Sequence, residues 1–182
     1  MFKIRQAVRV IRAGGVIAYP TEAMFGLGCD PAVPKAVQDI CEIKARPIAA
    51  GLILIGHALE QFEGWIDIGA AEQQRLQEPS DHPVTWVVPA GRRTGAWITG
   101  GRTSVAVRIT SHPLAAELCR AAGTPLVSTS ANRHGRPPAR TALVARLLFR
   151  DAVDLVVPGE IGRFTKPSEI RDVRTGAVLR AG

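Results

Sequence analysis

The segment PLVSTSAN, residues 125–132, begins as an apolar strand and ends in small polar side chains. Its last five residues supply three hydroxyl groups and one amide, at Ser128, Thr129, Ser130 and Asn132. Hydroxyl and amide groups donate and accept hydrogen bonds without adding charge, so they suit a ligand that is itself charged, such as a nucleotide or an amino acid. Capping of a local turn produces the same composition, and the segment alone does not separate the two interpretations.

Lys44 and Arg46 form a second group with binding chemistry. The apolar spacing predicts a helix over residues 34–45, and Lys44 falls on the same face of that helix as Val37. A lysine on an apolar face either extends to solvent or points into a polar pocket. A solvated helix end that complements the helix dipole is the ordinary alternative. Because Pro47 and a buried strand follow directly, the pair is a candidate for phosphate binding.

Two further strands carry polar residues at informative places. Arg108 lies inside the apolar segment SVAVRI, and a buried arginine without a partner is costly, so a carboxylate or a phosphate should lie nearby. A structural ion pair would meet this need equally well. The strand predicted over residues 15–19 ends at Pro20, and we expect Thr21 and Glu22 to be exposed just beyond it.

Several function classes are excluded by the motifs. The string GLGCDP lacks the third glycine of a dinucleotide-binding fingerprint, and the sequence contains no GxxxxGK[ST] phosphate loop. Three cysteines without CxxC spacing predict buried thiols in a reducing compartment, with neither a disulfide framework nor a metal site. No apolar run is long enough to cross a bilayer, so we expect a cytoplasmic protein that does not contact membranes.

The charge is unevenly distributed along the 182 residues, whose net charge is +7. Residues 1–91 carry 8 Lys and Arg against 10 Asp and Glu, whereas residues 92–182 carry 15 against 6. This asymmetry indicates a polyanionic partner near the C-terminal half, although a solvated basic face without a partner is the alternative.

Helical and strand patterns alternate along the chain. Helices are predicted over residues 3–13, 34–45, 57–78, 113–122 and 141–149. Strands are predicted over residues 15–19, 51–55, 84–88, 104–109, 125–129 and 153–157, followed by a hairpin over 169–180 with Gly176 in its turn. The first helix is basic and resembles a transit peptide, but Gly14 and Gly15 end it like an ordinary helix cap. The alternation predicts an α/β or α+β fold with one mixed sheet, and the length predicts a single domain over residues 1–182.

Taken together, the motifs resemble the YrdC-like family of threonylcarbamoyl-AMP synthases in its short bacterial form. The resemblance covers nearly the whole chain in the expected order. It is carried by the strings GGVIAYPTEAMFGLGCDP, KARP followed by GLILI, PVTWVVPA, VAVRITSHP, PLVSTSAN and VPGEIGRFTKPSEIRDVRTGAVLRAG. Each string is weak alone, whereas six in the right order and spacing are specific.

The resemblance implies a fold and a reaction. The fold would be an α/β sandwich around a twisted mixed sheet with a concave, positively charged cavity. The reaction would be nucleotidyl transfer, in which L-threonine, bicarbonate and ATP give threonylcarbamoyl-AMP and pyrophosphate for N6-threonylcarbamoyladenosine formation in tRNA. Mg²⁺ would be bound mainly through the phosphates, with no metal site in the protein. A downstream threonylcarbamoyl transferase complex would use the product.

The resemblance also implies roles for particular residues. The family's Lys-x-Arg and Ser-x-Asn residues fall on Lys44, Arg46, Ser130 and Asn132, with the two cations neutralising the triphosphate as catalytic residues. Further nucleotide contacts fall on Ser104 and Arg180. The threonine-holding positions fall on Thr21, Arg108, Ser128 and Ser168, and Arg108 would pair with the carboxylate of threonine. Glu22 is the candidate acidic helper.

Three segments depart from the family pattern and put loop geometry in question. They are Asp81-His82-Pro83, Ala49-Ala50 and His134-Gly135, and we expect His82 and His134 to be surface residues that bind no metal.

An RNA-binding module without catalysis is the alternative function. Five arginines could follow an RNA backbone: Arg133, Arg136, Arg140, Arg146 and Arg150. A carbamoyl-phosphate-using enzyme of hydrogenase maturation would need additional modules that this sequence lacks.

Overall fold

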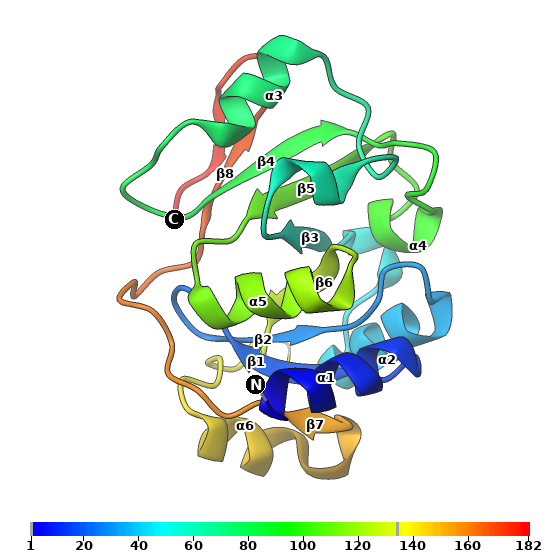
Figure 1. Ribbon diagram of the computed structural model, residues 1–182, viewed down its shortest axis with the longest axis vertical. Coiled ribbons are helices and arrows are strands. Elements are labelled where there is room, and N and C mark those ends of the chain that lie inside the picture. Colours follow the sequence, from blue (N-terminus) through cyan, green and yellow to red (C-terminus); the bar gives the residue numbers. More distant parts are fainter. Residues whose placement is uncertain (1, 134) are drawn as a thin grey trace.

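The computed structural model describes residues 2–133 and 135–182, and its core is one nine-stranded sheet. The strand order is β7-β1-β2-β6-β3-β5-β4-β8-β9, and Figure 1 shows it rising from β7 at the bottom to β4 near the top, with β8 beside β4. The strands are β1 (Ile17–Pro20), β2 (Phe25–Gly28), β3 (Ile53–Gly56), β4 (Val84–Pro89), β5 (Ser104–Ile109), β6 (Leu126–Ser130), β7 (Leu155–Val156), β8 (Glu169–Asp172) and β9 (Val178–Arg180).

The sheet is mixed, as the sequence predicts. Neighbours pair in parallel at β1–β7, β3–β5 and β4–β8, and the remaining pairs are antiparallel. The α-helices are α1 (Phe2–Arg12), α2 (Pro34–Lys44), α3 (Ala70–Gln77), α4 (Ala96–Thr99), α5 (Pro113–Ala122) and α6 (Ala142–Phe149). The 3₁₀ helices are η1 (Ile48–Ala50), η2 (Leu59–Phe62) and η3 (Arg150–Ala152).

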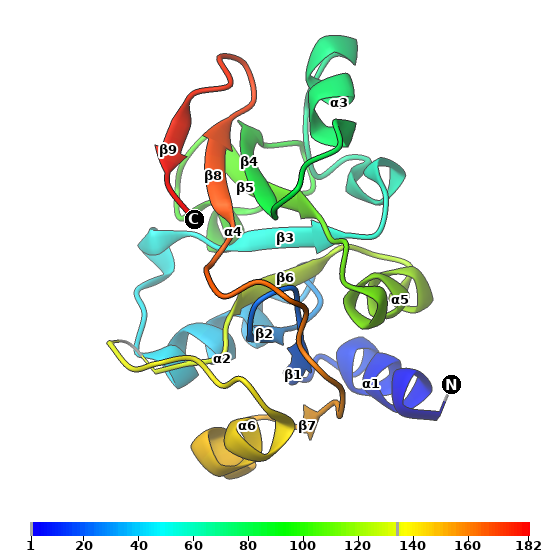
Figure 2. The same cartoon turned by 90° about the vertical axis from the view of Figure 1, so that its left-hand side faces the viewer.

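Each face of the sheet has its own apolar cluster because side chains alternate along a strand. Ile55 packs with α1 and α5 on one face, whereas its neighbour Leu54 packs with α2 and α4 on the other. Figures 1 and 2 show α1 and α5 side by side over the half of the sheet near β1. The same face farther toward β5 carries no helix, and there the sheet borders a cavity.

Helix α2 ends in a way that fixes the residues after it. Pro34 occupies the first turn, where its missing N–H is not needed. Ala45 follows the helix with φ of 50°, the left-handed conformation, and its N–H and that of Arg46 close the last turn. This cap turns the chain sharply, so Lys44 points inward and Arg46 lies just beyond the helix end.

The element predictions differ from the structure in three places. β2 lies within residues 20–33, where the sequence predicts neither a helix nor a strand. The strand was not predicted because Phe25-Gly26-Leu27-Gly28 contains two glycines and has low strand propensity. The helix predicted over residues 57–78 is confined to α3 and the short η2. The chain over residues 91–103, predicted as an irregular connection, contains α4.

The predictions for the final hairpin, the cysteines and the first helix are confirmed. The hairpin β8–β9 forms with Gly176 at φ of 75°, and all three cysteines are buried free thiols. Helix α1 packs on α5 through Ala7 and Ile11, as an ordinary first helix would. No helix within the described part of the chain is both long and apolar enough to span a bilayer. The single-domain organisation over residues 1–182 stays a prediction.

Candidate active site

A cavity of about 710 Å³ lies on the face of the sheet that α1 and α5 leave uncovered. Residues two apart on one strand share a face, which places Ser128 with Ser130 on β6 and Ser104 with Arg108 on β5 along this cavity. Nine of the ten residues singled out in the sequence line it: Thr21, Arg46, Ser104, Arg108, Ser128, Ser130, Asn132, Ser168 and Arg180.

Lys44, the tenth residue, lies behind the cavity wall. Its side chain is only 4% exposed. The ammonium donates to the backbone oxygen of Asn132 at 3.0 Å, to the Asn132 Oδ1 at 2.9 Å and to the backbone oxygen of Ser130 at 2.5 Å. Ser130 Oγ in turn donates to Asn132 Oδ1 at 2.7 Å. Lys44 therefore holds the end of β6 in place from beneath.

The acceptors around Lys44 are neutral, so its positive charge is not cancelled. Burial, reinforced by the nearby Arg46 charge, lowers the pKa of Lys44 to about 8. Both effects disfavour the ammonium form, and an anion bound in the cavity would favour it.

Arg46 is anchored by backbone carbonyls in the segment that follows it. Its Nη2 donates to the Gly51 carbonyl at 2.9 Å, and Arg102 donates to the Ala49 and Ala50 carbonyls at 2.7 Å and 3.0 Å. These contacts use the main chain, so they do not depend on which side chains stand at positions 49 and 50.

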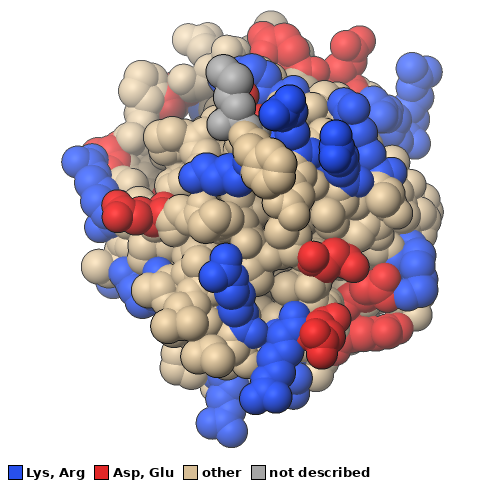
Figure 3. Space-filling model, turned by 60° about the horizontal axis from the view of Figure 1, so that its bottom comes forward, with Lys and Arg blue, Asp and Glu red and all other residues tan. Residues whose placement is uncertain are grey.

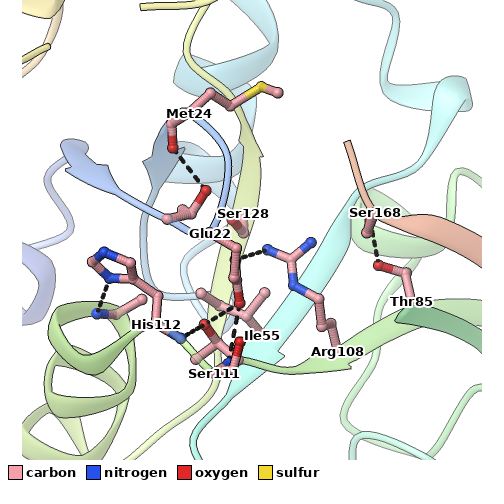
Figure 4. Close-up of polar contacts among 12 residues, drawn as sticks. Glu22, Met24, Ile55, Thr85, Arg108, Ser111, His112, Ser128 and Ser168 are labelled. Carbon is pink, nitrogen blue, oxygen red and sulfur yellow. Dashed lines mark hydrogen bonds and ion pairs between the residues drawn. The ribbon is translucent and has the colours of Figure 1, made fainter. Parts of the chain in front are cut away.

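Arg108 and Glu22 form a buried ion pair at the floor of the cavity (Figure 4). Arg108 Nη2 lies 3.2 Å from Glu22 Oε2, while Glu22 Oε1 accepts from Thr110 Oγ1 at 2.6 Å and from the Ser111 N–H at 3.1 Å. Burial alone would raise the pKa of Glu22, but the Arg108 charge and these hydrogen bonds hold it below its ordinary value. Glu22 is therefore an ionised anchor and not an acid poised to donate a proton.

The expectation that Thr21 and Glu22 are exposed is wrong. Their exposures are 6% and 4%, because residues 160–168 cross over them. The N–H of Gly162 donates to the Thr21 carbonyl at 2.9 Å, and that of Phe164 to the Glu22 carbonyl at 3.1 Å. Figure 2 shows this orange segment running from β7 to β8 across the strands. No local pattern in the sequence indicates such a long-range cover.

The crossing segment borders two cavities. Its first part, with Gly162 and Phe164, lines a second cavity of about 700 Å³, and its last part lines the first. Glu22 borders both. Ser168, where the segment meets β8, is buried and shares a hydrogen bond of 2.8 Å with Thr85.

Two arginine donors in the first cavity have no protein partner. Within the described residues, the Nε–H groups of Arg46 and Arg108 are buried and make no hydrogen bond. Buried donors are normally satisfied, so both groups indicate a missing acceptor. Both arginines line the cavity, which makes an anionic or carboxylate ligand the natural acceptor.

Three cations that border the cavity were not predicted as site residues: Arg102, Arg140 and Lys166. The Gly/Arg-rich composition of residues 91–103 could have indicated Arg102. Arg140 belongs to the arginine run considered above for RNA. The described residues contain no group of three or more His, Cys, Asp and Glu side chains able to hold a metal ion.

The five arginines considered for RNA are all exposed. Figure 3 shows the molecule from below the view of Figure 1, with Lys and Arg side chains spread across the surface and a group of Asp and Glu side chains to the right of its centre. His82 is partly exposed and lies beside Asp81, with Nδ1 and Oδ1 2.6 Å apart. His134 lies outside the described residues.

The family model Sua5_yciO_yrdC, described as telomere recombination, matches residues 9–182. The chain belongs to the Sua5/YciO/YrdC family.

Curated relatives of this Sua5/YciO/YrdC chain match over their full length. A threonylcarbamoyl-AMP synthase of Nitrosococcus oceani is 48% identical over 180 residues, covering 98% of this chain and 97% of that protein. One of Cellvibrio japonicus is 49% identical over 179 residues, covering 98% and 95%.

Solved structures agree with the family assignment. P. abyssi Sua5 complexed with L-threonine superposes with a TM-score of 0.91 at 31% identity, covering 98% of this chain and 54% of that chain. The chain thus spans about half of that protein. E. coli YciO gives a TM-score of 0.82 at 27% identity, covering 97% and 87%. A full-length HypF, at 17% identity and a TM-score of 0.81, shares the fold.

Proposed function

We propose that this protein is a threonylcarbamoyl-AMP synthase that converts L-threonine, bicarbonate and ATP to threonylcarbamoyl-AMP and pyrophosphate. The observation that carries the proposal is the presence of two arginines along one cavity, Arg46 and Arg108, each with a buried Nε–H that has no hydrogen-bond partner among the described residues. Two such groups suit a substrate pair with separate anionic ends, a triphosphate and an amino acid carboxylate. The family and its curated relatives support this assignment.

The nucleotide would bind at the end of the cavity formed by β6 and the segment after α2. Arg46 would contact the phosphates, and Lys44 would act on them through space while holding Ser130 and Asn132 as hydrogen-bonding groups. Ser104 and Arg180 line the same cavity and would add contacts to the nucleotide.

Threonine would bind over the Arg108–Glu22 pair. The carboxylate would accept from the Arg108 guanidinium group, and the hydroxyl groups of Thr21, Ser128 and Ser168 would complete the pocket. Thr21 Oγ1 donates to the Met24 carbonyl at 2.7 Å, so it can offer a ligand only its lone pairs.

The proposed chemistry needs orientation and charge compensation more than a strong base. The amine of threonine and bicarbonate would give a carbamate with loss of water. A carbamate oxygen would then attack the α-phosphorus in line, the bond to the bridging oxygen would break, and pyrophosphate would leave with the electron pair. Two anions must approach each other in this step, and Lys44, Arg46 and neutral donors would stabilise them. Glu22 would hold Arg108 in position and would not act as an acid.

Magnesium would enter as part of the nucleotide substrate. Glu22 is the one carboxylate among the described residues of the cavity lining, and its oxygens are already engaged by Arg108, Thr110 and Ser111. The protein therefore offers no carboxylate ligand there, and Mg²⁺ would be held by phosphate oxygens and water while shielding their charge.

The product would supply N6-threonylcarbamoyladenosine formation in tRNA. A carbamate–phosphate mixed anhydride is a reactive acyl donor, so a transferase must take it up. The exposed arginines near α6 would attract the phosphates of tRNA or another RNA, which we propose as an additional partner in the cytoplasm.

The test is mass-spectrometric detection of threonylcarbamoyl-AMP, together with pyrophosphate release, from purified protein given L-threonine, bicarbonate, ATP and Mg²⁺. Arg46→Met and Ser130→Ala should lose most of the product signal. Arg120→Met, which removes an exposed arginine of α5 outside the cavity, should retain it. Absence of product from folded wild type, together with salt-dependent RNA binding, would overturn the proposal in favour of an RNA-binding module.

A further inference from the structure

Tyr19, the one tyrosine of the sequence, connects the apolar core to the cavity wall. It lies on β1, is fully buried and packs in the cluster formed with α1 and α5. Its hydroxyl donates to Ser128 Oγ at 2.9 Å. Ser128 belongs to β6, which is separated from β1 by β2, so the tyrosine ring reaches across an entire strand.

Gly28 of β2 makes this reach possible. A Cβ atom on Gly28 would lie 2.7 Å from Tyr19 Cε1, too close for any side chain. The missing side chain of Gly28 therefore leaves the space that the Tyr19 ring occupies on its way to Ser128.

The direction of the hydrogen bond decides what Ser128 can do. A serine hydroxyl has one proton and two lone pairs. Because Tyr19 donates to one lone pair, the Ser128 proton is not needed for this contact and remains available to the cavity that Ser128 lines. Burial raises the pKa of Tyr19, so its hydroxyl keeps its proton and stays a donor.

We infer that Tyr19 is a positioning residue that holds the Ser128 hydroxyl as a hydrogen-bond donor toward an anionic oxygen of the amino acid substrate. The inference rests on the proposed binding of threonine in this cavity. Ser128 and Arg108 lie on the two strands that flank β3, opposite Ile53 and Ile55. Tyr19 thus supports the threonine end of the site through its hydrogen bond to Ser128.

Tyr19→Phe tests the inference because it removes the hydroxyl and keeps the ring. Loss of one hydrogen bond predicts that the KM for L-threonine rises about three- to tenfold. The KM for ATP should stay within a factor of about two. A purely structural defect would change both KM values or the amount of active protein, and it would not select threonine.

A second set of variants shows whether the effect passes through Ser128. Tyr19→Phe should add nothing to the threonine KM of Ser128→Ala, because the group that Tyr19 holds is already absent. Ile17→Val removes a methylene from the same buried cluster, and it should lower the melting temperature without changing the KM for threonine. Independent effects of Tyr19→Phe and Ser128→Ala would overturn the inference.

Direct binding of L-threonine, measured by isothermal titration calorimetry, separates this inference from the proposed function. Wild type that binds threonine but makes no threonylcarbamoyl-AMP would overturn the function, and the affinity of Tyr19→Phe would still test the role of Tyr19. Wild type that makes the product while Tyr19→Phe has unchanged threonine affinity would overturn the inference alone. Wild type that does neither would overturn both.

Discussion

Replacing Glu22 by glutamine should destabilise the protein strongly, because it leaves the Arg108 charge uncompensated in a buried site. At 3.2 Å, the attraction between the two groups is on the order of 5 kcal/mol for an effective dielectric constant of about 20. Removing one partner of a buried pair typically costs about 3–5 kcal/mol. Arg108 borders the cavity and keeps contact with water, so we expect a loss near 3 kcal/mol. For a chain of this length, the melting temperature should fall by roughly 6–12 °C.

The destabilisation caused by Glu22→Gln should decrease at acidic pH. The pKa of Glu22 is held below its ordinary value of 4.5, so the carboxylate stabilises the fold fully above about pH 4.5. That contribution is lost as the pH falls through the pKa of the folded state. The difference between wild type and Glu22→Gln should therefore be constant from about pH 5 to 8 and shrink toward pH 3.

Chemical unfolding of wild type and Glu22→Gln, followed by circular dichroism across this pH range, measures the difference. Glu117→Gln is the matched control, since Glu117 pairs with Arg120 on the surface with both side chains at least half exposed. Its cost should stay below about 1 kcal/mol. If Glu22→Gln costs no more stability at pH 7 than the control Glu117→Gln, or if its cost is unchanged at pH 3, the argument is refuted.

Two further perturbations follow from the structure. Because the pKa of Lys44 is lowered to about 8, the ammonium group is lost between pH 7 and pH 9.5, and affinity for an ATP analogue should fall about tenfold over this range. The affinity of Lys44→Met for the analogue should not depend on pH in this way. Gly162→Ala would place a Cβ atom 2.6 Å from the Glu22 carbonyl oxygen, so it should cost about 1–3 kcal/mol and speed hydrogen exchange at the Phe164 amide. Gly69→Ala, whose Cβ would approach only a flexible side chain, should leave hydrogen exchange at Phe164 unchanged.

The residues of the cavity wall were predicted from the resemblance to the YrdC-like family, together with the polar end of the segment 125–132. Strand periodicity explains why Ser128 and Ser130 share one face of β6, since residues two apart on a strand point the same way. The same periodicity places Ser104 and Arg108 together on β5. Helices and most strands were predicted from spacing that spans a few residues.

Contacts between distant segments were not predictable in this way. Arg108 and Glu22 are 86 positions apart, and nothing near either residue specifies the other. Burial of Thr21 and Glu22 depends on a segment that arrives some 140 residues later. The interior position of Lys44 was one of two alternatives that the helix pattern left open, and the fold decides between them through the end of β6.

The partners of the cavity cations divide the site into two electrostatic environments. Arg46, Arg102 and Arg180 are held by backbone carbonyls, and Lys44 by neutral oxygens, so among these contacts no carboxylate offsets the positive charge. Arg108 is instead paired with Glu22, which makes the floor of the cavity nearly neutral. A triphosphate is drawn to uncompensated cations.

A threonine zwitterion carries no net charge, so the nearly neutral floor formed by Arg108 and Glu22 suits it better than it suits a triphosphate. The same pair that stabilises the fold would therefore keep the triphosphate from occupying the threonine end. An uncompensated Arg108 would attract either substrate. On this argument, Glu22 contributes to the ordering of the two substrates along the cavity without taking part in proton transfer.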